Sequence, residues 1–270
     1  MKIIDSHAHI FPQKISEKAS GAIGEFYNIS MHHNGMAHVL SELSEEAGIS
    51  KTLVCSTATT PHQVEVINDF ICEKCKQYPS FIGIATLHQD MENPEAEIER
   101  IEKLGLSGIK LHPDFQKLNI DDEKMFPTYT LLEKKRLPIL FHTGDDRYDF
   151  SSPERLIKVM EKFPDLICIA AHFGGYASWD KAEKYPKSKN LYFDTSSSLD
   201  VIEKSQALSL IEKFGVSQFM FGTDFPMWTP KEEIKKVLDL GLSEKDYEQI
   251  FSKNFERLFG LNNQAVEYVF

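Results

Sequence analysis

The residues best suited to chemistry are histidines and an aspartate that follow short apolar runs. His7 and His9 stand two positions apart in Asp5-Ser6-His7-Ala8-His9, and His142 and Asp224 each follow a later run. Side chains at i and i+2 of a strand point to the same side, so both imidazoles of the pair can bind one ion. The four residues predict three nitrogen ligands and one oxygen ligand, with a position left for water. Such a set is typical of a catalytic zinc site.

Two residues are candidates for moving protons. Asp224 could bind the metal and also take a proton from a water molecule, whose pKa a bound metal can lower to about 7. His172 precedes Gly174-Gly175, which would let a substrate approach the backbone. We predict an acid, base or polarising role for His172; a fifth ligand and a purely structural histidine are the alternatives. Asp194 is expected to support the site without touching the metal.

Four further residues are candidate substrate contacts. Lys110 ends an apolar run and could anchor a substrate carboxylate, bridge two metal ions as a carboxylated lysine, or form a salt bridge in the wall. His112 is expected to contact the substrate or support the ligands. Arg147 and Trp228 could line the substrate pocket, although a solvated charge and a packed aromatic ring are equally compatible with their positions.

These residues need elements that bring them together. Short runs rich in Ile, Val, Leu and Phe predict eight strands: Lys2–Asp5, Thr52–Cys55, Phe81–Ala85, Gly108–Leu111, Pro138–Phe141, Leu166–Ala170, Leu191–Phe193 and Phe219–Phe221. Near-continuous apolar runs suit parallel strands covered on both sides. Amphipathic stretches of helical length lie between them: Met36–Ala47, Pro61–Tyr78, Pro94–Leu104, Glu123–Lys135, Pro153–Lys162, Val201–Phe214 and Pro230–Leu240.

Eight β/α units in 270 residues predict one domain, residues 1–270, folded as a (β/α)8 barrel. The strand ends of such a barrel share one rim, so the candidate residues would converge there. An open doubly wound sheet is the alternative, but no G-x-G-x-x-G follows the first strand. Residues 11–35 are too long for a simple connection and predict a lid over the rim. Ser243–Phe259 predicts an extra terminal helix.

Composition limits the partners. The net charge is -11 and no block of Lys or Arg occurs, which argues against nucleic acid or an anionic membrane. We see neither a signal peptide nor an apolar run of membrane-spanning length, and four cysteines do not make a disulfide framework. We therefore expect a cytoplasmic enzyme that acts on a small molecule, with a carboxylate among the candidate substrates. A homodimer is the assembly that we consider.

The ordered motifs resemble those of the amidohydrolase superfamily, and within it the branch that includes aminocarboxymuconate-semialdehyde decarboxylase. The motifs that carry the resemblance are Asp5-Ser6-His7-Ala8-His9, Gly108-Ile109-Lys110-Leu111-His112-Pro113, His142-Thr143-Gly144, Ala171-His172-Phe173-Gly174-Gly175, Gly222-Thr223-Asp224-Phe225-Pro226 and the tail from Asn254 to Leu261. The resemblance implies a (β/α)8 barrel and one divalent ion. It makes His7, His9, His142 and Asp224 the ligands, with Asp224 also a base and His172 an acid or base. Zinc is favoured, manganese is an alternative, and a two-metal site that includes Lys110 is less favoured.

The family resemblance leaves the reaction open, because this branch contains both hydrolases and decarboxylases. Our leading prediction is hydrolysis of a C–N or C–O bond, as in an amide or lactone, by a metal-activated water. The alternative is non-oxidative decarboxylation of a small unsaturated or aromatic acid at the same site. A barrel that binds metal or ligand without turnover is the third hypothesis.

Overall fold

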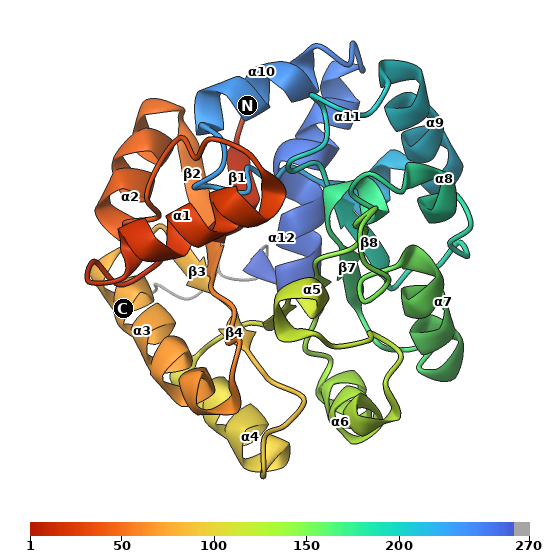
Figure 1. Cartoon of the computed structure of the whole chain (residues 1–270). Helices are drawn as coiled ribbons and strands as arrows, with labels where there is room; N and C mark the ends of the chain where they lie inside the picture. The colour runs from red at the N-terminus through yellow and green to blue at the C-terminus, as the bar shows by residue number, and fades with distance from the viewer. Residues whose placement is uncertain (262–270) are drawn as a thin grey trace, which may run out of the picture.

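Parallel strands form the centre of the computed structural model, which describes residues 1–261 (Figure 1). Two sheets have the orders β1-β2-β3 and β4-β5-β6-β7-β8-β9, and every pairing is parallel. The strands are β1 (Ile3–His9), β2 (Ile49–Cys55), β3 (Phe81–Gly83), β4 (Ala85–Thr86), β5 (Ile109–Leu111), β6 (Ile139–Phe141), β7 (Cys168–Ala170), β8 (Leu191–Asp194) and β9 (Phe219–Met220). Each predicted strand is present, and the third is divided into β3 and β4.

Backbone hydrogen bonds join the two sheets into a barrel. On one side, β3 and β4 are separated only by Ile84, whose N–H donates to the carbonyl of Val54 in β2 (3.1 Å). On the other side, the chain after β9 runs beside β1. The N–H of Ser6 donates to the carbonyl of Phe221 (2.8 Å), and the N–H of Asp224 donates to that of His7 (2.7 Å). The predicted (β/α)8 barrel is confirmed.

Helices follow the strands in chain order, and the longer ones lie around the outside of the barrel, whereas the short α5 lies near the centre of the view (Figure 1). They are α2 (Ala37–Glu46), α3 (Val64–Gln77), α4 (Pro94–Leu104), α5 (Pro113–Gln116), α6 (Phe126–Lys135), α7 (Pro153–Lys162), α8 (Trp179–Ala182), α9 (Lys204–Phe214) and α10 (Pro230–Leu238). Short 3-10 turns precede three of them, as η1 (Pro61–Gln63), η2 (Glu123–Met125) and η3 (His172–Gly174), and η4 (Val216–Gln218) lies between α9 and β9. The predicted terminal helix is present as α11 (Glu244–Glu248), a π-helical segment η5 (Gln249–Lys253) and α12 (Asn254–Phe259).

The barrel interior is packed with side chains from alternate strand positions. Leu53, Leu140 and Ile169 belong to this inner cluster, and Phe255 of α12 packs into it. Because strand side chains alternate between faces, Leu140 and His142 share a face of the β6 segment. Leu140 therefore fills the barrel interior, and His142, two residues later on the same face, lies at the rim. This alternation explains why catalytic candidates follow the apolar runs.

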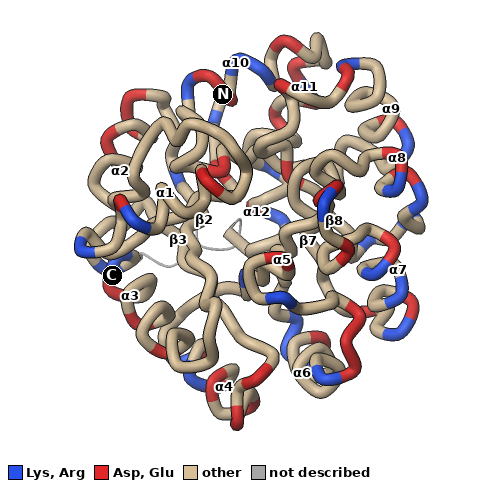
Figure 2. The backbone as a smooth tube through the Cα atoms, in the orientation of Figure 1, with Lys and Arg blue, Asp and Glu red and all other residues tan. Residues whose placement is uncertain are grey.

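The segment after β1 is built around a helix, α1 (Ser16–Tyr27), that lies across the rim between β1 and α2 (Figure 1). This placement agrees with the predicted lid. Helix α1 ends at Asn28, which adopts a left-handed conformation (φ 54°) and lets the chain turn back. Figure 2 shows acidic and basic residues interspersed along the outer helices, so neither sign of charge forms a broad patch in that view. Within residues 1–261 we find no helix that combines the length and apolar character of a membrane span.

Candidate metal centre

Three of the four predicted ligands meet at the rim. The Nε2 atoms of His7 and His9 are 3.1 Å apart, and Asp224 Oδ1 lies 3.5 Å from the first and 3.4 Å from the second. A tetrahedral ion with metal–nitrogen bonds of about 2.0–2.1 Å would hold its donors about 3.3 Å apart. The observed separations therefore fit donors that share one ion.

The tautomer of His7 agrees with a ligand role. Its Nδ1 lies 2.9 Å from Asp194 Oδ2, so the proton sits on Nδ1 and the Nε2 lone pair faces His9 and Asp224. Burial and the nearby Lys110 together lower the pKa of His7 to about 4, so the ring is neutral. The predicted supporting position of Asp194, behind a candidate ligand, is what the geometry shows.

The other two members of the cluster hold a proton that a metal could displace. Burial lowers the pKa of His9, but Cys55 and Asp224 outweigh it and raise the value to about 9. Burial raises the pKa of Asp224, but His7 and His9 outweigh this effect and hold it well below its usual range. The His9 imidazole and the Asp224 carboxylate share one proton. A divalent ion that binds both groups would displace that proton.

Backbone strain occurs in the loops that carry these groups. His172 (φ 60°), Phe173 (φ 53°), Ser197 (φ 50°) and Asp224 (φ 55°) all have left-handed backbone conformations, which are costly for residues other than glycine. Such conformations cluster at functional sites, where the surrounding structure holds them in place. Here they follow three neighbouring strands.

The fourth predicted ligand, His142, makes its closest contacts with His172 and Gly144 and not with the other three predicted ligands. Its Nδ1 lies 3.0 Å from His172 Nε2, and its Nε2 lies 3.1 Å from the carbonyl oxygen of Gly144. His172 Nδ1 in turn lies 3.1 Å from the carbonyl oxygen of Ser196. Since those carbonyls can only accept, each ring carries its proton on the outer nitrogen. The two inner nitrogens then face one another with lone pairs, an arrangement that a cation or a proton between them would satisfy.

Gly144 is required by the packing next to His142. It has φ 83°, and a side-chain carbon there would lie 2.4 Å from backbone atoms of Gly175 and Tyr176. Only glycine permits this conformation and this close approach of two loops. The approach fixes the loops that carry His142 and His172.

Lys110 lies inside the cluster. The side chain is fully buried, with Nζ 3.1 Å from His7 Nε2, and burial lowers its pKa. The structure therefore places Lys110 beside the predicted ligand His7.

The remaining predicted contacts surround the site. His112 lies on the cavity wall, with its ring stacked on that of His142 at 4.0 Å. Trp228 Nε1 donates to Ser197 Oγ (2.8 Å), which donates to Asp224 Oδ2 (2.6 Å), so Trp228 helps to orient Asp224. Arg147 binds Asp145 and lies over the ring of Phe26 at 4.4 Å. Its guanidinium therefore supports the lid.

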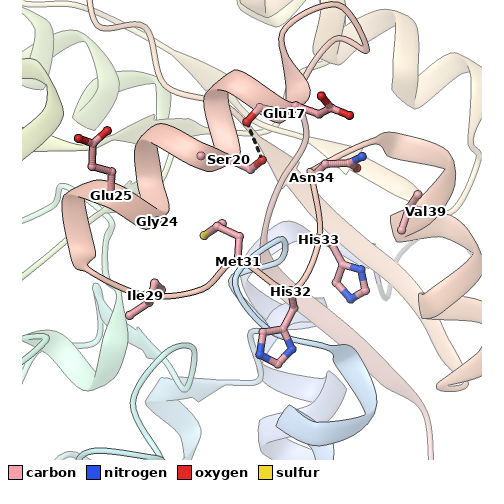
Figure 3. A pocket seen from close by; sticks show the side chains of 11 residues that line it. Glu17, Ser20, Gly24, Glu25, Ile29, Met31, His32, His33, Asn34 and Val39 are labelled. Carbon is pink, nitrogen blue, oxygen red and sulfur yellow. Dashed lines mark hydrogen bonds between the residues drawn. The ribbon is translucent and has the colours of Figure 1, made fainter.

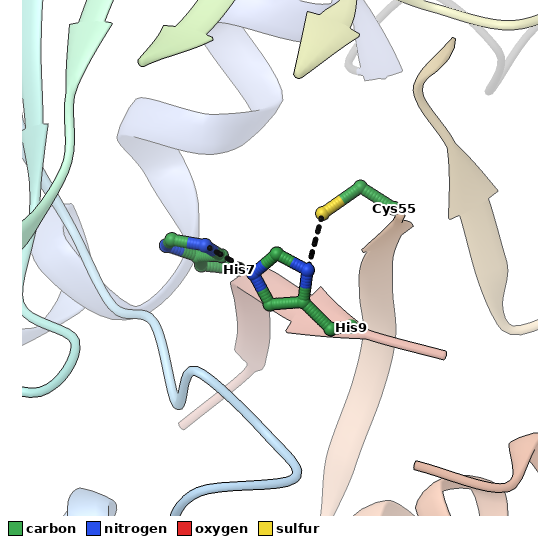
Figure 4. Close-up of side chains that lie close together, drawn as sticks. All are labelled: His7, His9 and Cys55. Carbon is green, nitrogen blue, oxygen red and sulfur yellow. Dashed lines mark hydrogen bonds between the residues drawn. The ribbon is translucent and has the colours of Figure 1, made fainter. Parts of the chain in front are cut away.

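Sequence reasoning missed three neighbours of the site. Cys55, at the end of β2, places Sγ 3.6 Å from His9 Nδ1, and its strand-end position was a usable signal (Figure 4). Asp114 directly follows the motif Gly108-Ile109-Lys110-Leu111-His112-Pro113, so its place next to that motif was a usable signal. Tyr27 reaches the site from α1, and its hydroxyl lies 3.1 Å from His112 Nε2. Nothing local in the sequence indicates where a lid residue will point.

A cavity of about 820 Å³ opens from the cluster. Its wall includes His7, His9, Lys110, His112, His142, His172 and Asp224, together with Phe11, Ile15, Ile23, Phe26, Phe70, Phe115 and Met227. The wall therefore combines a polar, metal-binding part with a broad apolar part. A second hollow of about 550 Å³ lies between α1 and the segment that follows it, where His32 and His33 line one side (Figure 3).

Comparisons with known proteins agree with this arrangement. A model of the amidohydrolase family matches residues 4–261. Among solved structures, an uncharacterised TIM-barrel protein from Bordetella bronchiseptica is 21% identical, with a TM-score of 0.77 over 96% of this chain and 99% of its own.

Two further solved structures share the fold. A 5-carboxyvanillate decarboxylase from Sphingomonas paucimobilis is 15% identical, with a TM-score of 0.74 over 96% of this chain and 99% of its own. A dihydroxybenzoic acid decarboxylase from Polaromonas sp. JS666, with bound manganese and 2-nitroresorcinol, is 18% identical, with a TM-score of 0.74 over 99% of both chains. Because the family model spans nearly the whole chain, this protein belongs to the amidohydrolase family.

Proposed function

We propose that this protein is a metal-dependent decarboxylase that removes a carboxyl group, without oxidation, from a small aromatic or unsaturated acid. The observation that carries the proposal is the cavity, in which a broad wall of aromatic and aliphatic side chains adjoins a buried metal-binding cluster. An apolar wall suits a planar hydrocarbon ring, and a divalent ion suits its carboxylate. Two of the similar solved structures are named as decarboxylases of benzoic acid derivatives, which supports this alternative over our leading hydrolase prediction.

One divalent ion is the proposed cofactor, held by His7, His9, His142 and Asp224. When bound, it would orient the acid and stabilise negative charge that develops on it. The donor set of imidazole nitrogens and a carboxylate suits zinc and also manganese, and manganese is the metal in the Polaromonas structure. His142 would need to present Nδ1 to the shared ion and exchange its contact with His172.

The protein residues supply the proton. When the bond between the ring carbon and the carboxyl carbon breaks, its electron pair stays on the ring carbon and carbon dioxide leaves. That carbon then accepts one proton. Asp224 and His172 are the two candidates for relaying it, because both line the cavity next to the cluster. Either the Asp224 carboxylate or the free Nε2 of His172 first takes up a proton from water and then passes it to the ring carbon. Ser197 fixes the Asp224 carboxylate, and the Ser196 carbonyl fixes His172.

Hydrolysis of an amide or lactone is the second candidate. The observation that favours it is the contact of the Asp224 carboxylate with the predicted ligand His9 (Oδ1–Nε2 3.4 Å), because a carboxylate beside a bound ion could accept a proton from a metal-activated water. The same residues would serve either reaction, so only the products separate the two.

A product assay on the purified enzyme tests the proposal. The protein is stripped of metal, reloaded with manganese or zinc, and incubated with two panels, one of benzoic acid derivatives and one of lactones and amides. We expect release of carbon dioxide from a benzoic acid, dependent on metal. Hydrolysis of a lactone or amide without decarboxylation of any acid would contradict the proposal.

Two variants test the roles at the metal. His142→Ala should lose most of its bound metal, because it removes a ligand, whereas His172→Ala should keep the metal and lose turnover by about 100-fold or more. Elemental analysis and the carbon dioxide assay give the two readings. Full metal occupancy in His142→Ala, or wild-type turnover in His172→Ala, would remove the respective assignment.

A further inference from the structure

The end of β2 places a thiol behind His9. In the parallel pairing of β1 with β2, His9 lies opposite Cys55, and the N–H of Ile10 donates to the carbonyl oxygen of Cys55 (3.0 Å). Cys55 is a free cysteine with no exposed surface, and its Sγ lies 3.6 Å from His9 Nδ1. The register of the two strands therefore holds the sulfur beside a predicted metal ligand.

The sulfur lies on the outer edge of the His9 ring. His9 Nε2 faces His7 Nε2 (3.1 Å) and Asp224 Oδ1 (3.4 Å), whereas Nδ1 faces the sulfur of Cys55 (Figure 4). Within residues 1–261, this sulfur is the one hydrogen-bond partner of His9 Nδ1. An ion bound to Nε2 would therefore leave the sulfur outside its coordination sphere, behind the ring.

The thiol proton has an acceptor of its own. Cys55 Sγ lies 3.5 Å from the carbonyl oxygen of Ala8, which can only accept, so the thiol donates to it. The lone pairs of the sulfur are then available to the N–H at His9 Nδ1, since sulfur is a weak acceptor. With a proton held on Nδ1, the ring presents the Nε2 lone pair once the proton shared with Asp224 has left.

We infer that Cys55 is a positioning residue for the metal centre: its thiol accepts the Nδ1 proton of His9 and holds Nε2 toward the shared ion. The inference rests on the metal centre of the proposed function. His7 has a comparable partner in Asp194, whose Oδ2 lies 2.9 Å from His7 Nδ1. The two ligands from β1 thus differ in support, because one has a carboxylate behind it and the other a neutral thiol.

Direct ligation by the thiol is the alternative. His7, His9 and Cys55 each offer a donor atom within 4.8 Å of the others. To bind an ion on His9 Nε2, however, the sulfur would have to leave Nδ1 and the Ala8 carbonyl and reach the opposite edge of the ring. The strand pairing fixes the backbone at both residues, and Cys55 packs with Leu53 in the inner cluster. The packing therefore favours the position behind the ring.

Cobalt serves as the probe. Wild type, Cys55→Ala and Cys55→Ser are stripped of metal and titrated with Co²⁺ alone, and competition with a chelator gives the affinity. We expect Cys55→Ala to bind Co²⁺ about tenfold more weakly, at the lower end of the usual loss when a ligating histidine loses its partner, because a thiol is a weak acceptor. The visible d–d bands should change as well, since the ring is less firmly oriented. Cys55→Ser keeps a donor and an acceptor, so it should bind Co²⁺ more tightly than Cys55→Ala.

Cys168→Ala is the matched control. Cys168 is also free and fully buried on a barrel strand, but the hydrogen-bond partner of its sulfur is the carbonyl oxygen of Leu166 (3.8 Å). Loss of a buried sulfur should lower the free energy of unfolding in both alanine variants, whereas Co²⁺ affinity should fall only in Cys55→Ala. Equal Co²⁺ affinity in Cys55→Ala and the wild type would overturn the inference. A sulfur-to-cobalt charge-transfer band that disappears in Cys55→Ala would also overturn it, because Cys55 would then be a ligand.

Metal binding and turnover separate this inference from the proposed function. If Cys55→Ala binds Co²⁺ more weakly but the wild type releases carbon dioxide from no acid, the inference stands and the decarboxylase proposal fails. Release of carbon dioxide by the metal-loaded wild type, together with an unchanged Co²⁺ affinity in Cys55→Ala, would give the reverse result.

Discussion

At the scale of the residue, Asp194 shows how a buried carboxylate serves the metal site without being a ligand. Oδ2 holds His7 Nδ1 at 2.9 Å, while Oδ1 accepts from the backbone N–H groups of His172 (3.1 Å) and Ser196 (3.0 Å). Burial raises the pKa of Asp194, but His7, His172 and the Ser196 hydroxyl outweigh it and lower the value to about 2. The carboxylate therefore stays ionised and fixes the orientation of two functional histidines.

We expect Asp194→Asn to weaken metal binding by about 10- to 100-fold, the usual effect of removing a carboxylate behind a ligating histidine. An amide can no longer favour the His7 tautomer that presents its Nε2 lone pair. Competition with a chelator measures the affinity. Asp180→Asn, on the exposed surface, is the control and should match the wild type. An unchanged affinity in Asp194→Asn would show that the tautomer of His7 does not depend on this contact.

At the scale of the element, the lid helix α1 is held by one arginine. Arg147 donates to the carbonyl oxygen of Phe26 at the end of α1 and lies 4.4 Å from the ring of that residue. Asp145 holds the guanidinium at 2.7 Å. Phe26 also packs edge-on against Phe115 at 4.8 Å. These contacts keep Tyr27 over the cavity, so order in the lid and geometry in the site are linked.

Arg147→Ala should loosen α1 while leaving the barrel intact. The change removes one hydrogen bond to α1 and the cation–π contacts with Phe26 and Tyr27, so we expect local opening of residues 16–27 to rise about tenfold. Hydrogen exchange followed by mass spectrometry would show faster exchange in α1 and unchanged exchange in β5 and β6. Lys231→Ala, on the exposed face of α10, provides a control. Equal protection of α1 in wild type and Arg147→Ala would mean that the aromatic packing alone holds the lid.

At the scale of the whole molecule, one buried acid makes the fold sensitive to pH. Glu233 in α10 is buried; Oε1 contacts Lys236 Nζ at 2.6 Å, and Oε2 has no hydrogen-bond partner within residues 1–261. Burial raises its pKa from 4.5 to about 7, since it outweighs the attraction of Lys236. Between those two pH values the folded protein keeps a proton that the unfolded chain has lost. The contribution of Glu233 to stability therefore falls as the pH rises through this window.

Glu233→Gln should abolish this part of the pH dependence. The free energy of unfolding of the variant should exceed that of the wild type by at most on the order of 3 kcal/mol at pH 8, and the difference should vanish near pH 4. Denaturant unfolding at several pH values measures it. Glu161→Gln, an exposed position, should follow the wild type. A difference between Glu233→Gln and the wild type that does not grow with pH would contradict the assignment.

The sequence by itself determined the barrel and its rim, and it predicted the types of ligand that gather there. Apolar runs separated by amphipathic stretches depend on local periodicity, which survives without knowledge of the fold. The alternation of strand side chains then carried His142 and Asp194 to the rim. The sequence did not show that the third predicted strand is divided into β3 and β4. The division lies at Ile84, because β3 pairs with β2 and β4 pairs with β5.

Only the tertiary structure decided which nitrogen of each histidine is free and what the lid brings to the cavity. His142 faces His172, Lys110 lies against His7, and Tyr27 lies against His112, although each pair is far apart in the chain. These contacts depend on rotamers and on hydrogen bonds to distant backbone carbonyls. Such features have no local signature, because they are set by the packing of neighbouring loops and by the residues that those loops bring together.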